Sequence, residues 1–143
     1  MRGAAKFLAG VSREIPWHVT SFHPDYKMSA DKGYVKTQAD TLIRAYDYGR
    51  EAGLCFVYPG NLPGAVGARE HTYCPNCDQL AIKRHGFYVL FNTMTGDCCF
   101  NCGKKIPGVW EANPPRQSTG TGFPIPVRLP TYDRARGRTG VGT

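Results

Sequence analysis

The sequence predicts an α/β protein that carries a small antiparallel metal-binding module. Two observations predict this class: a strand, a helix and a strand follow one another over residues 15–58, and two Cys-x-x-Cys pairs flank an alternating segment. With 143 residues, the chain is long enough for one domain and a small satellite. It is too short for a closed eight-fold barrel, which takes about 250 residues. The 17 Gly and 11 Pro indicate that part of the chain is loop or tail.

The N-terminal part combines the end of a helix with a first strand. We expect residues 1–14 to be helical, and residues 15–22 have the β-branched and aromatic content of a buried strand. Residues 23–26 follow as a loop. The apolar run over residues 4–11 is far shorter than the roughly 20 residues that span a bilayer, and it lacks a signal-peptide pattern. We therefore expect a soluble, cytoplasmic protein without membrane contact.

A helix and a second strand complete the unit. Thr37 and Asp40 have the spacing of a helix-capping pair, and apolar side chains then recur at near-helical spacing until Gly53. Residues 54–58 form a continuous apolar run, which is typical of a strand buried on both faces of a parallel sheet. Because two strands and a helix do not bury a core alone, we interpret this unit as one piece of a larger sheet.

Four cysteines have the spacing of a metal site. Cys74 and Cys77 form one Cys-x-x-Cys knuckle, Cys99 and Cys102 form another, and the 21 residues from 78 to 98 separate them. Two knuckles supply the four thiolates of a structural zinc site, which lie at about 2.3 Å from the ion. The residues that follow the knuckles, Asp78 and Gly103, are expected to adopt positive φ, which glycine tolerates better.

Other uses of these cysteines remain open. A disulfide requires an oxidising compartment, a redox Cys-x-x-Cys usually begins a helix, and iron is accepted by the same four thiolates. Cys98 adjoins Cys99 and is an alternative fourth ligand. Cys55 lies in an apolar run and is interpreted as a small buried hydrophobe. The Cys-x-x-x-Cys-x-x-Cys motif of radical-generating enzymes is absent. Cys98 and Cys102 have the first spacing of this motif, but Lys105 stands where its third cysteine would be.

Polar and aromatic side chains gather where the two parallel strands end. Ligands of α/β sheets bind outside the carboxyl ends of the strands, so these side chains are candidates for a pocket. The alternative is that they satisfy local backbone groups and form turns. The candidates are Trp17, His18, His23, Asp25, Tyr26 and Asn61.

Residues 111–143 differ in composition from the rest of the chain. They contain five Pro, five Gly and five Arg against two acidic residues, so 5 − 2 = +3 of the net charge of +7 lies there. Such a segment buries too little apolar area to offset its chain entropy, and we expect a disordered basic tail.

Several segments, taken in order, resemble the C-terminal part of the AmmeMemoRadiSam system radical SAM enzyme, a family that is similar to pyruvate formate-lyase activating enzyme. The resemblance covers roughly residues 13–110. The segments are IPWHVTSFHPDYKM, TLIRAYDYGREAGLCFVYPGN, HTYCPNC and CFNCGKKIPGVW.

The resemblance implies a partial radical SAM barrel over residues 1–66, followed by a zinc-ribbon-like module over residues 67–110. It also implies 4Fe-4S and S-adenosylmethionine as cofactors, but the cluster-binding cysteines belong to an N-terminal half that this sequence lacks. Cys74, Cys77, Cys99 and Cys102 match the family's metal-binding appendage, and Cys98 falls outside it. Trp17, His18 and His23 match a late barrel strand, and Asn61 matches the end of the last recognisable strand.

Two functions follow. In the first, the chain is a C-terminal fragment, from a truncated or split gene, that is inactive until a partner half supplies the cluster and the cofactor. In the second, it is a stand-alone zinc-ribbon binding module whose basic tail contacts nucleic acid, with an affinity that falls as salt rises. The second function does not require residues 17–61, whereas the first explains them.

Overall fold

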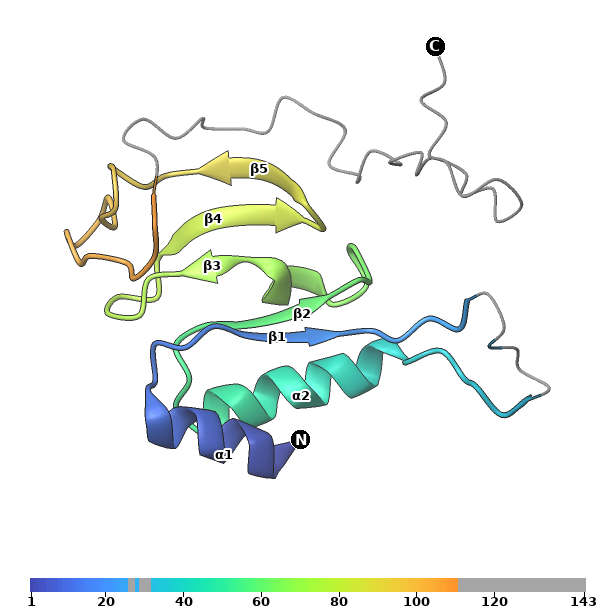
Figure 1. Cartoon of the computed structure of the whole chain (residues 1–143). Helices are drawn as coiled ribbons and strands as arrows, with labels where there is room; N and C mark the ends of the chain where they lie inside the picture. Colours follow the sequence, from blue (N-terminus) through green and yellow to red (C-terminus); the bar gives the residue numbers. More distant parts are fainter. Residues whose placement is uncertain (26–27, 29–31, 111–143) are drawn as a thin grey trace, which may run out of the picture.

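The computed structural model describes residues 1–25, 28 and 32–110. The order of its elements is α1 (Arg2–Val11), β1 (Trp17–Thr20), α2 (Ala39–Glu51), β2 (Val57–Gly60), the short 3₁₀ helix η2 (Gly67–Glu70), β3 (Thr72–Tyr73), β4 (Leu80–His85) and β5 (Tyr88–Asn92). The predicted basic tail and Tyr26 lie outside the described residues. Figure 1 shows both α-helices on one side of the β1–β2 pair and the other three strands on its far side.

The first half is a parallel strand–helix–strand unit, as the sequence predicts. Strands β1 and β2 pair in parallel, with Trp17 opposite Val57 and Thr20 opposite Gly60. The backbone N–H of Trp17 donates to the Phe56 carbonyl at 2.9 Å, and the N–H of Ser21 donates to the Gly60 carbonyl at 3.0 Å. The two strands therefore run together and end at the same edge.

Helix α2 covers one face of this pair at a very short distance. A Cβ atom on Gly49 would lie 2.7 Å from Val57 Cγ2 and 3.0 Å from Trp17 Cε3. Leu42 and Ala45 of the same helix are buried. Because side chains alternate along a strand, Trp17 and Val57 face α2, whereas His18 and Tyr58 face away from it.

Three local predictions need correction. The first strand is shorter than residues 15–22 and alternates between half-buried and exposed residues, because α2 covers only one of its faces. The second strand begins at Val57 rather than at residue 54, because residues 54–56, of which Leu54 and Phe56 are buried, form a bend outside the strand. Thr37 does not cap α2, which has Gln38 at its N-cap; the Thr37 hydroxyl instead accepts a hydrogen bond from the Phe22 N–H at 3.1 Å.

The second half is an antiparallel three-stranded sheet in the order β3-β4-β5. Strands β4 and β5 form a hairpin within the predicted antiparallel module, and the turn of this hairpin contains Gly86 with φ of +58°. Both pairings contain a register shift, the second one between Lys83 and Arg84. The hairpin brings the segment after β5 back to the start of β4, where the two cysteine pairs lie.

A hydrophobic cluster joins the two halves. Phe56, which precedes β2, packs with Ala81 and Ile82 of β4 and with Ile106 near the end of the described chain. Tyr58 and Trp110 pack against this cluster and are partly buried. The antiparallel module that carries the four cysteines is thus fixed to the edge of the parallel pair by apolar contact.

No helix among the described residues is long and apolar enough to cross a membrane.

Candidate functional site

Four cysteine thiols meet beside the antiparallel sheet. The Sγ atoms of Cys74, Cys77, Cys99 and Cys102 all lie within 4.8 Å of one another. Cys74 Sγ is 3.6 Å from Cys102 Sγ, and Cys77 Sγ is 3.8 Å from Cys99 Sγ. A tetrahedral ion with Zn–S bonds of about 2.3 Å separates its sulfur ligands by about 3.8 Å, so the four thiols fit one zinc ion.

The two knuckles have the same backbone geometry. The Asp78 N–H donates to the Cys74 carbonyl at 3.0 Å, and the Gly103 N–H donates to the Cys99 carbonyl at 2.9 Å. Asp78 has φ of +52° and Gly103 has φ of +67°, as the sequence predicts. Each turn therefore folds back at its fifth residue, which directs two thiols to a common point.

A second pair of hydrogen bonds repeats in both knuckles. The Cys74 N–H donates to the Gln79 carbonyl at 2.9 Å, and the Cys99 N–H donates to the Lys104 carbonyl at the same distance. The first cysteine of each knuckle is buried, with Cys74 fully inaccessible and Cys99 2% exposed. The module thus holds one inner thiol and one more accessible thiol from each turn.

The surroundings shift the pKa values of two of the metal-free thiols, those of Cys74 and Cys102, in opposite directions. Burial raises the pKa of the Cys74 thiol to about 11. The hydrogen bond from the Lys104 backbone, followed by one from the Asn76 side chain, lowers the pKa of the exposed Cys102 thiol to about 6. A bound cation favours the thiolate of every ligand, and it offsets the cost of ionising the buried Cys74.

The remaining two cysteines lie apart from this cluster. Cys98 Sγ donates to a carboxylate oxygen of Asp97 at 3.2 Å, and Asp97 also forms an ion pair with Lys105 at 2.8 Å. The structure therefore brings Cys99 rather than Cys98 to the metal group. Cys55 is only partly buried, and its backbone N–H donates to the Arg13 carbonyl at 2.8 Å.

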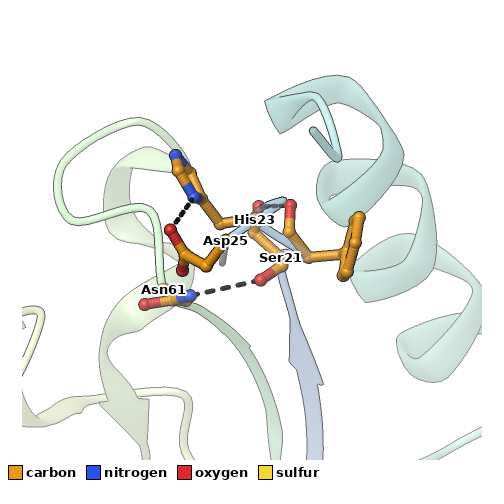
Figure 2. A network of polar contacts seen from close by, with 5 residues as sticks. Ser21, His23, Asp25 and Asn61 are labelled. Carbon is orange, nitrogen blue, oxygen red and sulfur yellow. Dashed lines mark hydrogen bonds and ion pairs between the residues drawn. The ribbon is translucent and has the colours of Figure 1, made fainter. Parts of the chain in front are cut away.

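The strand-end candidates separate into two groups. Trp17 packs against α2, whereas His18 lies on the opposite face of β1, where its ring centroid is 5.1 Å from that of Tyr58. His23 and Asp25 follow β1 in an exposed loop and form a hydrogen bond of 3.2 Å. Asn61 follows β2 with φ of +63° and donates to the Ser21 carbonyl at 3.2 Å (Figure 2).

A cavity of about 390 Å³ lies on the face of β1–β2 that α2 does not cover. It brings His18 and Asn61 together, but Trp17 and His23 are not among its lining residues. The β4–β5 hairpin contributes residues that the sequence did not single out. The lining consists of His18, Tyr58, Pro59, Gly60, Asn61, Leu62, Pro63, Glu70, Arg84, Gly86 and Phe87.

Glu70 and Arg84 are the charged residues of this lining. Glu70 is 7% exposed, and its two carboxylate oxygens accept hydrogen bonds from the N–H groups of Gly64 at 2.5 Å and Gly86 at 2.6 Å. These bonds connect the loop after β2 to the hairpin turn. The sequence gives no signal for either residue, because neither belongs to a motif and the hairpin reaches the cavity only through tertiary packing.

The comparisons with known proteins identify a longer relative. A protein of Methanocaldococcus jannaschii that is described as uncharacterized is 41% identical over 98 residues, which are 67% of this chain and 28% of the relative. The chain therefore spans less than a third of the length of that relative. No protein-family model and no solved structure match the chain.

Proposed function

We propose that this chain is the C-terminal part of a radical SAM enzyme that resembles the AmmeMemoRadiSam system family, and that its four-cysteine group holds structural zinc. The single observation that carries the proposal is the parallel β1–α2–β2 unit with His18 and Asn61 at one cavity. This arrangement agrees with the segments that resemble the family, because ligands of parallel sheets bind at the carboxyl ends of the strands.

The edges of the parallel pair support the same proposal. Trp17 and Ser21 direct their N–H groups to β2, so the alternation of a strand directs those of His18 and Thr20 to the opposite edge. Among the described residues, no strand pairs with that edge. An unpaired edge of this kind accepts a preceding strand, as a barrel fragment requires.

The outer edge of β2 has the opposite character. The carbonyls of Phe56 and Gly60 accept hydrogen bonds from the N–H groups of Trp17 and Ser21. Because backbone groups alternate along a strand, the backbone nitrogen of Pro59 is directed away from β1. Proline has no N–H to donate to a further strand. We therefore propose that β2 is the last strand of the sheet and that the metal-binding module covers its edge.

The zinc site and the radical chemistry are separate in this proposal. The four thiols lie close enough together to complete the ligand set of one tetrahedral ion, which is typical of structural zinc. The resemblance assigns reductive cleavage of S-adenosylmethionine to a 4Fe-4S cluster held by an N-terminal half. The residues of this chain would then bind substrate at the cavity and fix the end of the sheet.

Reconstitution with an N-terminal half tests the proposal. The partner is a segment from the same genome that carries Cys-x-x-x-Cys-x-x-Cys, loaded with its cluster under anaerobic, reducing conditions. We expect 5′-deoxyadenosine to form faster when this chain is added than with the partner alone. The control is the same mixture with one cluster cysteine of the partner replaced by alanine. If the added chain leaves the rate unchanged, the proposal is wrong.

A further inference from the structure

The cavity beside β1–β2 is built by both halves of the molecule. His18, Tyr58 and Gly60 face it from the parallel pair, and Arg84 and Phe87 face it from the hairpin of the metal-binding module. Phe87 is 73% exposed and extends its ring at the hairpin tip. The module that carries the four-cysteine group therefore also forms one wall of this cavity.

Arg84 is a partly buried cation that has no negatively charged partner within the described part of the chain. Its Nη1 donates to the Thr72 hydroxyl, and its guanidinium carbon lies 5.7 Å from the centre of the Tyr58 ring. It forms no ion pair with any carboxylate of the described residues. Glu70, the acidic residue of the same lining, uses both of its oxygens for the backbone N–H groups of Gly64 and Gly86.

Removing the charged guanidinium of Arg84 partly from water costs free energy, and a bound anion offsets this cost. Burial lowers the pKa of Arg84, although an arginine remains charged at neutral pH. A partly desolvated charge without a counter-ion destabilises the folded state, and a carboxylate or phosphate restores the balance through two parallel hydrogen bonds. Arginine suits this task better than lysine because its fork matches both groups.

We propose that the cavity binds a small organic anion, with a carboxylate or phosphate group on Arg84 and the carbon skeleton against Tyr58 and Phe87. The apolar and aromatic lining with few polar groups is typical of small-molecule sites. That this anion is the substrate of an enzyme rests on the proposed function. The binding site itself rests only on the described side chains.

Direct binding to the zinc-loaded chain tests this inference without S-adenosylmethionine. Benzoate, phenyl phosphate and benzamide are titrated separately while ¹H–¹⁵N spectra follow the Arg84 side chain and the backbone of residues 61–64 and 84–87. Benzoate and benzamide have nearly the same shape but differ in charge. We expect saturable shifts with an anion and none with benzamide. Preference for benzoate or for phenyl phosphate then identifies the anionic group.

Two variants and one matched control define the site. Arg84→Gln should weaken anion binding about ten- to hundred-fold, because it removes a charged hydrogen-bond donor. Gly60→Val should also weaken binding, because a Cβ there meets only Thr20 Oγ1 at 3.7 Å and the added methyl groups take up part of the cavity. Lys83→Gln removes the same charge from the adjacent exposed residue and should leave the affinity unchanged.

Retained zinc and unchanged shifts of residues 74–77 show that each variant is folded. The inference is wrong if neither anion produces saturable shifts, if benzamide binds as well as benzoate, or if Lys83→Gln weakens binding as much as Arg84→Gln. These results are independent of the reconstitution experiment, which reads S-adenosylmethionine cleavage. An anion site without cleavage would contradict the proposed function alone.

Discussion

The Asn61 side chain joins the carboxyl ends of the two parallel strands by donating to the Ser21 carbonyl at 3.2 Å (Figure 2). Asn61 also has φ of +63°, a conformation that asparagine tolerates better than most residues. Ser21 is 3% exposed, and its hydroxyl donates to the Thr37 carbonyl at 3.2 Å. One hydrogen bond therefore connects the end of β2 to the segment that leads from β1 to α2.

Replacement of Asn61 by alanine should destabilise this end of the sheet. Asn61→Ala removes the hydrogen bond to Ser21 and puts alanine at a positive φ, which it tolerates less well than asparagine, so we expect a loss of about 1–2 kcal/mol in the free energy of unfolding. Asn61→Gly removes the same bond without the steric cost and should lose less. Urea unfolding of the zinc-loaded chain measures both. Equal losses would show that backbone strain at residue 61 contributes nothing.

The four-cysteine cluster should bind one zinc ion per chain. Cys99→Ser removes a buried ligand and should abolish stoichiometric zinc, whereas Cys98→Ser changes a thiol that bonds to Asp97 and should retain it. Elemental analysis after dialysis measures the zinc content. Loss of zinc in Cys98→Ser with retention in Cys99→Ser would assign the fourth ligand to Cys98.

Removal of the metal should unfold the module selectively. Zinc binding contributes much of the stability of small metal-binding modules, so a chelator should increase amide hydrogen exchange over residues 71–110 more than in α1 and α2. Hydrogen exchange with and without the chelator provides the measurement, and re-addition of zinc should restore protection. Unchanged protection over residues 71–110 after verified zinc loss would contradict the prediction.

Gly49 permits the close approach of α2 to the strands. Gly49→Ala places a Cβ 2.7 Å from Val57 Cγ2, and we expect a loss of about 1–3 kcal/mol in unfolding free energy. Gly10→Ala in α1 is the matched control, because nothing lies within 4 Å of its Cβ position. The control should gain about 0.5–1 kcal/mol from higher helix propensity. A gain at both positions in thermal unfolding would show that α2 does not pack this closely.

Glu70 should stabilise the junction between the β2 loop and the hairpin. Glu70→Gln keeps the shape of the side chain but leaves one partly buried N–H, of Gly64 or Gly86, without its acceptor, which costs about 1–3 kcal/mol. Glu51→Gln is the control, since Glu51 is exposed and lies 3.9 Å from Arg2. Its unfolding free energy should change by less than about 0.5 kcal/mol. Equal effects in chemical unfolding would refute a special role for Glu70.

Local sequence patterns predicted the parts of this protein that depend on neighbouring residues. The spacing of Cys74, Cys77, Cys99 and Cys102 predicted the metal group, and the positions of Asp78 and Gly103 predicted the positive φ that closes each knuckle. Both features depend on a few consecutive residues, because a turn and a thiol pair are short-range geometries. The strand–helix–strand order was predicted for a similar reason, from the periodicity of apolar side chains.

The tertiary structure alone decided which side chains share a site. His18 and Trp17 are neighbours in sequence, but the alternation of β1 places one at the cavity and the other against α2. Thr37 lost its predicted capping role because Phe22, distant in sequence, offers an N–H to its hydroxyl. Arg84 reaches the cavity only because the hairpin packs beside β2, through apolar contacts that no local pattern records. Motifs thus determined the cysteine group that can hold a metal, whereas long-range packing determined the composition of the cavity.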